Sequence, residues 1–150
     1  MNKEKHPELA VRAVISTKTH ILVCHVTGDK SFYFLPGGRV EPGESLAQGL
    51  FRELREELPE LFSVCVELDS YYLGAIEALF KDQHSLQHFF RVLVPDLTHE
   101  KIPSDHKFDG ISFEWLLLDG LENKSLKPPS LAPLLLGDER SAWYRLDDER

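Results

Sequence analysis

A short run of glutamates is the part of this sequence with the clearest capacity for chemistry. Glu53 is followed by Glu56 and Glu57, so the three stand at i, i+3 and i+4. On a helix, these positions share one face within about one turn. Three carboxylates on one face repel one another, and a hard cation that binds oxygen ligands, such as Mg²⁺ or Mn²⁺, relieves that repulsion. The pattern therefore favours a divalent-metal site.

A solvated charged face is the competing interpretation, because most runs of Glu and Arg on helices are no more than that. Three observations count against it here. Gly38, Glu44 and the glutamate run stand at one fixed spacing, a strand-like segment precedes them, and no lysine balances the acidic face. The spacing therefore favours a functional site over a solvated surface.

The carboxylates need a helix to position them, and the sequence predicts one between Ser45 and Pro59. Ser45 is a good N-cap and Gln48 completes a capping box. The residue before a proline is pushed out of the α region, so Pro59 ends the helix. Its predicted core face is a stripe of apolar residues, Leu46, Leu50, Leu54, Leu58 and Leu61, with Ala47 and Phe51 beside it.

Gly49 is unusual inside this predicted helix, because a mid-helix glycine costs about 1 kcal/mol relative to alanine. We interpret it as a place where another backbone segment approaches closely. Residues 35–38, which precede the helix, are the predicted segment.

The segment from Gly38 to Glu57 resembles the Nudix box, glycine-x5-Glu-x7-Arg-Glu-Leu-x-Glu-Glu-x-Gly-hydrophobic. Every defining position through Glu57 matches, and the flanking residues 32–38 and 41–45 are also similar to the family. The sequence departs at the end of the box, where Pro59 replaces the glycine and Glu60 the hydrophobic residue. Proline cannot adopt the positive φ of a C-terminal glycine, so the helix exit must differ.

The resemblance implies an α/β (α+β) fold, the Nudix-type α/β/α sandwich around a mixed β-sheet, with residues 1–150 as one domain. It also implies a hydrolase that cleaves a pyrophosphate bond in a nucleoside diphosphate linked to another group, using metal-activated water. Glu56 and Glu57 are the first-choice ligands for Mg²⁺ or Mn²⁺. Glu53 is a third ligand or the general base, and the Gly37 backbone carbonyl is a further ligand by resemblance.

The predicted catalytic and substrate-binding set is completed by Arg52 and Gly38 of the box and by Arg12. Arg52 is expected to orient carboxylates by pairing with Glu56 or Glu44; the alternative is an ordinary surface pair. Gly38 is assigned to substrate binding. Arg12, a cation in an apolar strand, is predicted to face phosphate, and an outward-facing edge arginine is the equal alternative.

Outside the box the signals are weaker. Additional carboxylates that could serve as metal ligand or base are Glu77, Glu100 and Asp105, although most acids in such positions are solvated. His84 and His88 stand on a predicted strand, which argues against a paired metal site. The aromatic residues that could stack a base are Tyr33, Tyr71, Tyr72 and Trp115, although aromatic residues in strands more often belong to the core.

Composition fits a soluble globular protein, with 150 residues, 42% hydrophobic and 28% charged. The net charge of −8 argues against nucleic acid and acidic membranes as partners, which would need a basic patch. The predicted partner is a small nucleotide-derived molecule, and a homodimer is compatible with the sequence. Cys24 and Cys65 are predicted to be reduced core cysteines. No signal peptide or membrane span is apparent, so a cytoplasmic location is the expectation.

The remaining elements are mostly strands. A C-terminal helix is predicted to open at residues 128–130 and stop at Gly137, and residues 138–150 are predicted to be a polar tail with at most a short helix. The predicted strands are residues 10–16, 21–26, 32–35, 62–68, 71–80, 86–94 and 111–118.

Two other classes of function compete with the hydrolase. A non-catalytic nucleotide-binding or regulatory module on the same fold would usually lack a box glutamate, and this sequence retains all of them. A structural domain with a solvated acidic face would gain no stability from metal. Among substrates, the sequence does not select between nucleoside triphosphates, ADP-ribose and dinucleoside polyphosphates, and the absence of a basic surface argues against capped RNA.

Overall fold

The alternating apolar segments fold into two β-sheets in a computed structural model that describes residues 6–62, 69–103, 108–137 and 142–150. The strand order is β4-β1-β6-β5-β8 in the larger sheet and β3-β2-β7 in the smaller. In chain order the elements are β1 (Glu8–Val14), β2 (His20–Val26), β3 (Phe32–Phe34), β4 (Gly37–Arg39), α1 (Leu46–Glu57), α2 (Pro59–Phe62), β5 (Ser70–Phe80), β6 (Gln83–Val92), β7 (Ile111–Leu117), the 3₁₀-helix η1 (Leu121–Asn123), α3 (Leu131–Leu135) and β8 (Trp143–Asp148).

The five-stranded sheet is mixed, as predicted. Strand β1 pairs antiparallel with β4 on one side and parallel with β6 on the other. Strands β5 and β6 form an antiparallel hairpin, and β8 runs parallel to β5. The two edges of this sheet are therefore β4 and β8.

The chain crosses from the smaller sheet to the larger one between β3 and β4. At the crossing, the Ala13 amide of β1 donates to the Pro36 carbonyl over 2.8 Å. The Leu22 amide of β2 donates to the Ile15 carbonyl over 2.9 Å, which joins the two sheets just beyond the same end of β1. The Ala13 bond continues the pairing of β4 with β1 and so helps to position the loop that leads into α1.

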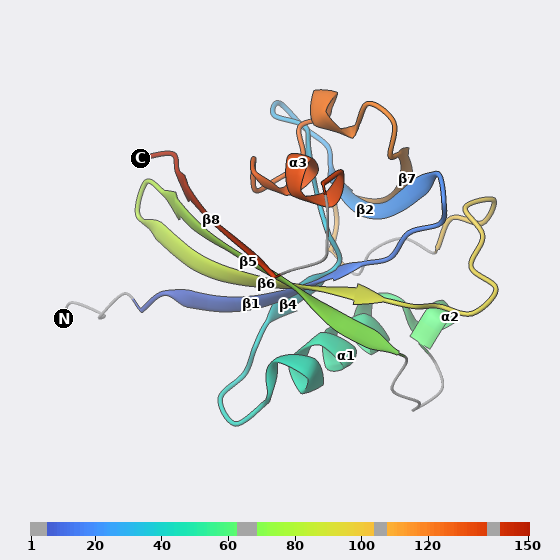
Figure 1. The fold of residues 1–150 in the computed structure, drawn as a ribbon, viewed down its shortest axis with the longest axis horizontal. Coiled ribbons are helices and arrows are strands. Elements are labelled where there is room, and N and C mark those ends of the chain that lie inside the picture. The colour runs from blue at the N-terminus through green and yellow to red at the C-terminus, as the bar shows by residue number, and fades with distance from the viewer. Residues whose placement is uncertain (1–5, 63–68, 104–107, 138–141) are drawn as a thin grey trace.

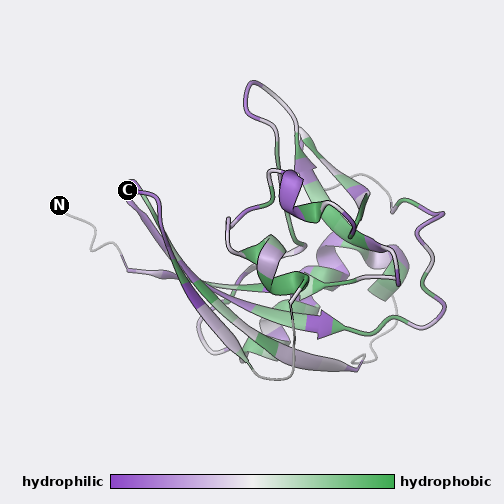
Figure 2. Cartoon of the chain, turned by 45° about the horizontal axis from the view of Figure 1, so that its top comes forward, coloured by the Kyte–Doolittle hydropathy of each residue, from purple (hydrophilic) through white to green (hydrophobic). Residues whose placement is uncertain are grey.

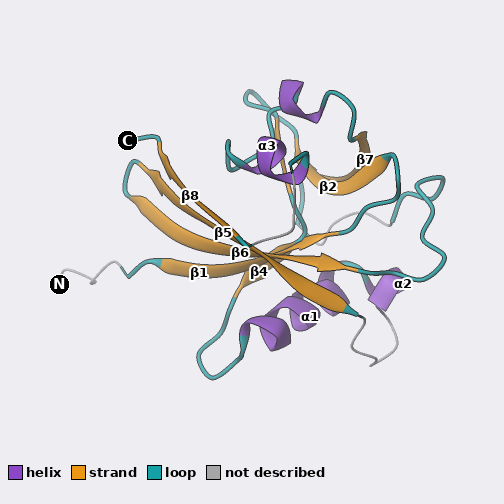
Figure 3. Ribbon diagram, in the orientation of Figure 1, coloured by secondary structure: helices purple, strands orange, loops and turns teal. Residues whose placement is uncertain are grey.

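Helices cover both sides of the larger sheet, which confirms the predicted sandwich. Figure 1 shows α1 below this sheet and α3 above it, and Figure 3 shows the same layers by secondary structure. Two apolar clusters correspond to the two layers: one contains Leu50 and Leu54 of α1, and the other contains Leu131 and Ala132 of α3. Hydrophobic residues concentrate where these elements meet (Figure 2).

Most predicted strands are confirmed to within a few residues. Strand β1 begins earlier than expected, and β6 spans Gln83–Val92 instead of residues 86–94. Cys24 is a free, buried cysteine in β2, and desolvation raises the pKa of its thiol. Cys65 and most of the strand predicted at 62–68 lie outside the described residues.

The predictions for the end of the first helix are partly wrong. Helix α1 ends at Glu57 with Leu58 as its C-cap, as the proline rule requires. Pro59, however, starts a short second helix, α2, because proline fits the first helical position, where no amide hydrogen bond is needed. Phe62 belongs to this helix and not to a strand.

The prediction of a polar tail at 138–150 is wrong for the residues that are described. Trp143–Asp148 forms β8, a parallel partner of β5. Its side chains are mostly exposed because it is an edge strand, so no continuous apolar segment announces it. Trp143 secures its start, with its ring centroid 5.4 Å from that of Phe89 on β6.

Candidate active site

Helix α1 holds the glutamate run because its beginning and its apolar face are both fixed. Ser45 accepts from the Gln48 amide over 3.1 Å, and the Gln48 side chain accepts from the Ser45 amide over 2.8 Å, which confirms the predicted capping box. Leu50 and Leu54 are completely buried on the adjoining face. With one face buried, the adjoining carboxylate face must lie at the edge of the sheet, beside β4.

Arg52 gathers most of these carboxylates around one guanidinium. Its Nε lies 2.7 Å from Glu44 Oε2, and its Nη2 lies 3.0 Å from Glu44 Oε1. Its Nη1 lies 2.8 Å from Glu53 Oε1 and 3.6 Å from Glu56 Oε1. The structure therefore brings together both partners predicted for Arg52, and the two-point contact with Glu44 fixes the plane of the guanidinium.

The same guanidinium also contacts the loop before the helix, a contact that the sequence did not suggest. Arg52 Nη2 donates to the Arg39 carbonyl over 3.0 Å, and Glu41 Oε2 lies 3.9 Å from Nε. A backbone acceptor has no signature in the sequence, so no residue pattern could have revealed the Arg39 contact. It ties the helix to the end of β4.

These ion pairs change the protonation behaviour of Glu44. The hydrogen bond from Arg52 is the main cause that lowers the pKa of the Glu44 carboxyl, and the Glu41 amide, which donates to it over 2.8 Å, contributes. The hydrogen bond with Glu44 in turn raises the pKa of Arg52. Both groups therefore stay charged over the whole physiological range of pH.

Gly38 gives the Glu53 carboxylate the space it occupies. A Cβ atom added at Gly38 would lie 2.5 Å from Glu53 Cδ, closer than any real Cβ contact. The Glu53 side chain is only 13% exposed, and it is held between this glycine and Arg52. The glycine of the motif is thus required by a carboxylate of the same motif.

Gly37 contacts Glu57 through its backbone amide, and its missing Cβ leaves space for strand β1. The Gly37 amide donates to Glu57 Oε2 over 3.2 Å, and Glu57 is buried, with 8% of its surface exposed. Gly37 has φ of 145°, and a Cβ there would lie 2.0 Å from the Val11 carbonyl oxygen. Glu56 differs from its two neighbours, because its side chain is 46% exposed. The three glutamates therefore differ in exposure while sharing one helical face.

The prediction for Gly49 is wrong in its partner. A Cβ added at Gly49 would meet Glu44 Oε1 and Val40 Cγ2, both at 3.3 Å, and not residues 35–38. The close approach is real, but it comes from the loop after β4, because that loop folds back along the start of α1. The segment 35–38 instead meets α1 further along, at Glu53 and Glu57.

Arg12 points toward the crossing between the sheets. Its Nη1 donates to the Leu35 carbonyl over 3.3 Å, and its guanidinium carbon lies 5.5 Å from the Phe34 ring centroid. Burial lowers the pKa of Arg12, while the charges of Glu57 and Glu53 act in the opposite direction. Its Nε is buried and has no hydrogen-bond partner among the described residues. This position is interior, unlike the outward edge position that was the alternative.

The other predicted carboxylates are placed away from this network. Glu77 on β5 lies 3.4 Å from His84 Nε2. The Glu100 amide donates to Thr98 Oγ1 over 3.2 Å, in the loop after β6. Asp105 lies outside the described residues.

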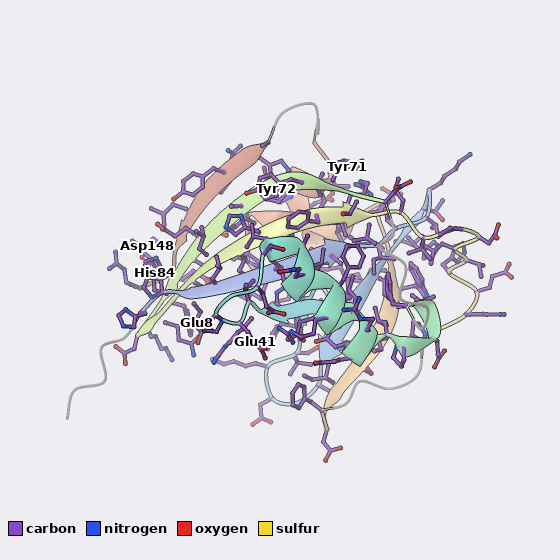
Figure 4. The ribbon with its side chains drawn as sticks, turned by 90° about the horizontal axis from the view of Figure 1, so that it is seen from below. Glu8, Glu41, Tyr71, Tyr72, His84 and Asp148 are labelled. Atoms are coloured by element: carbon purple, nitrogen blue, oxygen red, sulfur yellow. The ribbon has the colours of Figure 1, made fainter. Side chains whose placement is uncertain are left out.

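The histidine and aromatic residues named from the sequence have separate partners. Tyr33 stacks on His25, with centroids 4.3 Å apart, and Trp115 Nε1 donates to the Lys101 carbonyl over 2.9 Å. Tyr72 and His88 are joined by a 2.8 Å hydrogen bond across β5 and β6. Figure 4 labels Tyr71 and Tyr72, whose side chains are 47% and 42% exposed. None of these contacts selects a base-stacking residue.

The chemistry of the donor set fits a hard divalent cation. Glu53, Glu56, Glu57 and the Gly37 carbonyl offer only oxygen atoms, which Mg²⁺ and Mn²⁺ prefer. As the side chains stand, the described residues contain no three His, Cys, Asp or Glu side chains arranged to hold a metal ion. Arg52 supplies the positive charge beside Glu53 and Glu56 instead. Metal binding by these residues stays a prediction.

Comparison with protein families gives one match, to the NUDIX domain, over residues 6–135. No curated protein matches the chain. None of the helices in the described part of the chain has the length and apolarity needed to cross a membrane.

Solved structures share the fold at low sequence identity. The E. coli ORF135 protein is 24% identical, with a TM-score of 0.61 over 86% of this chain and 88% of that one. The MutT protein from Methanosarcina mazei Go1 is 21% identical, with a TM-score of 0.63 over 90% and 94%. An ADP-ribose pyrophosphatase from Streptococcus suis is 19% identical, with a TM-score of 0.54 over 95% and 100%.

Proposed function

The chain belongs to the Nudix family of pyrophosphohydrolases, and we propose that it cleaves the pyrophosphate bond of a nucleoside diphosphate linked to another group. The observation that carries the proposal is the Arg52 network, which holds Glu44 and Glu53 together while Gly38 of β4 leaves space for the Glu53 carboxylate. A merely solvated acidic face would not need a glycine where one of its carboxylates packs. The arrangement fixes anionic groups in one place at the edge of the sheet, where a substrate can reach them.

We assign the metal to the oxygen donors on α1 and β4. Glu56, Glu57 and the Gly37 carbonyl would hold Mg²⁺ or Mn²⁺, with Glu53 as a third carboxylate ligand or as the general base. When bound, such a cation lowers the pKa of water and neutralises charge on the pyrophosphate. Glu56 is the most exposed of the three glutamates and is therefore the most accessible to an arriving ion.

Arg52 is proposed to position carboxylates without touching the substrate. Glu44 occupies its Nε and Nη2, which leaves Nη1 directed at Glu53 and Glu56. This arrangement sets the rotamer of Glu53 before any substrate arrives. If Glu53 accepts the proton of the attacking water, its carboxylate must lie within hydrogen-bond reach of that water.

Arg12 and Gly38 are the residues that we propose bind the substrate. Among the described residues the buried Arg12 Nε has no hydrogen-bond partner, and a phosphate oxygen that reached it would accept its hydrogen bond. Gly38 presents backbone without a side chain, which allows close approach, in addition to making room for Glu53. The single-domain organisation and the cytoplasmic location stay predictions.

The test is release of phosphate or nucleotide from a panel of nucleoside triphosphates, ADP-ribose and dinucleoside polyphosphates, with and without Mg²⁺ or Mn²⁺. ADP-ribose belongs in the panel because one structural neighbour is described as an ADP-ribose pyrophosphatase. Glu57→Gln is expected to reduce turnover by about 10²-fold or more, and Glu56→Gln likewise. Glu122→Gln, an exposed glutamate on η1, is the matched control and is expected to retain full activity.

Metal binding is measured separately, so that a missing substrate does not obscure it. Mg²⁺ or Mn²⁺ should raise the melting temperature of the wild type and not that of Glu57→Gln, because a ligand that binds only the folded state stabilises it. Full activity in both glutamine variants would overturn the ligand assignment. A metal-induced rise in melting temperature without hydrolysis of any compound would favour the non-catalytic binding module.

A further inference from the structure

Strand β8 is an open edge of the larger sheet. It pairs with β5 on one side, and no described strand pairs with its other side (Figure 1). The Glu149 amide, just beyond β8, donates to the Leu79 carbonyl of β5 over 2.8 Å. Since backbone groups alternate in direction along a strand, those of Tyr144, Leu146 and Asp148 point away from β5. These groups are available to a further strand.

This edge lacks several of the devices that usually keep an exposed strand from pairing. Natural edge strands are protected by proline, by charged side chains and especially lysine, by bulges or by covering elements. Strand β8 contains neither proline nor lysine, and its charged residues, Arg145, Asp147 and Asp148, are of both signs. Tyr144 is 55% exposed and Leu146 52% exposed, and they project from the same face of the strand, so a further strand could cover both.

The charges of β8 identify what covers it. The sequence of β8, Trp-Tyr-Arg-Leu-Asp-Asp, has a positive charge just before Leu146 and a negative charge just after it. Two antiparallel copies of the strand are therefore complementary in charge about Leu146. In an antiparallel pair centred there, Leu146 lies opposite Leu146 of a second copy, and Arg145 lies opposite Asp147 in both directions. Opposite charges on directly facing residues stabilise a strand pair.

We propose that β8 is a homodimer interface, in which two copies of this chain join their five-stranded sheets edge to edge through antiparallel β8 strands. The neighbouring registers fail on the same chemistry. Moving the pairing by two residues places Arg145 opposite Arg145, or Asp147 opposite Asp147, and like charges directly opposite are destabilising. Moving the pairing by one residue places residues whose backbone groups point away from β5 opposite residues whose groups point toward β5, so the two strands cannot form their hydrogen bonds.

The carboxylate of Asp147 is already held in place for this pairing. Asp147 Oδ2 accepts from the Ser130 amide over 2.9 Å, and Oδ1 accepts from the Ser130 hydroxyl. Arg145 is less committed, because its Nη1 donates only to the neighbouring Tyr144 carbonyl over 2.8 Å among the described hydrogen bonds. That carbonyl points outward, so strand pairing would replace the local contact with a backbone hydrogen bond.

The dimer is expected to be weak and to leave the proposed active site open. Two strands of 6 residues form a contact at the small end of the range of protein interfaces, so association should depend on concentration. The carboxylates of α1 lie beside β4, the opposite edge of the same sheet. The oligomeric state is therefore independent of hydrolysis, and the two proposals can fail separately.

Analytical ultracentrifugation across protein concentrations up to about 1 mM measures the association. The wild type should shift from monomer to dimer as concentration rises. Arg145→Glu should remain monomeric, because the introduced carboxylate of each copy would lie opposite Asp147 of the other copy. Lys18→Glu, a charge reversal in the turn before β2, is the control and should dimerise normally. The double variant Arg145→Glu with Asp147→Arg should regain dimerisation, since it restores opposite charges.

Cross-linking tests the register in a Cys65→Ser background. Leu146→Cys places two thiols at the twofold axis, where paired Cα atoms about 5.5 Å apart allow a disulfide. Tyr144→Cys is the control, because its counterpart in the second copy lies four residues along the strand. A disulfide-linked dimer of Leu146→Cys but not of Tyr144→Cys supports the proposed register. This result tests the proposal even if the double charge variant does not fold. A wild type that stays monomeric, or a dimer unaffected by Arg145→Glu, would overturn it.

Discussion

At both edges of the five-stranded sheet, a glycine with positive φ allows a neighbouring strand to approach closely. At the β4 edge, Gly37 has φ of 145°, and its absent Cβ would lie 2.0 Å from the Val11 carbonyl oxygen. At the other edge, Gly74 of β5 has φ of 152°, and its absent Cβ would lie 2.1 Å from the Trp143 carbonyl oxygen of β8. Both glycines let a neighbouring strand approach in a conformation that other residues rarely adopt.

What lies beyond each edge differs. Helix α1 covers β4 and places Glu53 and Glu57 against Gly38 and Gly37, so the edge is closed by carboxylates. No described element covers β8, which presents exposed Tyr144 and Leu146. Under our two proposals, one edge serves hydrolysis and the other serves association with a second copy. Substitutions at the two edges should therefore affect different measurements.

The largest effect is expected at Gly38. Gly38→Ala introduces a methyl group that would lie 2.5 Å from Glu53 Cδ, and the flexible carboxylate must move, which also disturbs its bond with Arg52. We expect turnover to fall by about 10²-fold while the melting temperature changes little. Gly49→Ala is the control. It also adds a methyl group beside the carboxylates of α1, but with nearest contacts of 3.3 Å, and the variant should keep most of its activity. Equal activity of Gly38→Ala and wild type would show that Glu53 need not hold its position.

Gly74→Ala should have the next largest effect, on stability and not on catalysis. Its neighbours are backbone atoms of Trp143, which cannot move aside as a carboxylate can. A residue forced into such a conformation costs about 1–3 kcal/mol. Urea unfolding should show this loss of unfolding free energy, while kcat of the remaining folded protein stays near the wild-type value. A large loss of kcat in folded protein would mean that the two edges are coupled.

Arg52→Lys should have a smaller effect on the β4 edge. Lysine keeps the charge but cannot contact Glu44 at two points and Glu53 at a third, as the guanidinium does. We expect kcat to fall by about 10-fold, with metal affinity reduced by a similar factor. Arg55→Lys, about one turn along α1 from Arg52 and outside the network, is the control. An unchanged kcat in Arg52→Lys would show that charge alone suffices.

The smallest predicted effect is a pH dependence of stability at the β4 edge. The pKa of Glu44 is lowered in the folded protein, mainly by its hydrogen bond with Arg52. The ionised Glu44 carboxylate therefore contributes its full stabilisation of the folded state above the pKa of about 4.3 that glutamate has in the unfolded chain. This stabilisation is lost as the pH falls through the lower pKa of Glu44 in the folded protein. The stability difference between wild type and Glu44→Gln, measured by urea unfolding, should shrink on acidification below that pH. A difference that stays constant down to pH 2 would contradict the ion pair.

Sequence patterns predicted the helix beside β4 well because its signals are local, whereas the short strand β4 itself, Gly37–Arg39, was not predicted. The capping residues Ser45 and Gln48 and the stripe of leucines specify α1 within a single segment, and Glu53, Glu56 and Glu57 share a face by helical periodicity alone. The mixed sheet and its two covering helices also followed from the family resemblance. The roles of these residues in metal binding and catalysis stay predictions.

The three-dimensional structure alone decided the contacts between segments that are distant in the chain. Only packing reveals that Gly38 makes room for Glu53, that Val40 and not residues 35–38 approaches Gly49, and that the Arg39 carbonyl binds Arg52. Strand β8 was missed because an exposed edge strand needs no apolar periodicity and takes its place from the partner strand β5. Local periodicity thus determined the helix that carries the proposed metal ligands, because its signals lie within one segment. Long-range backbone pairing determined the two sheet edges, one beside that helix and one open to the proposed second copy.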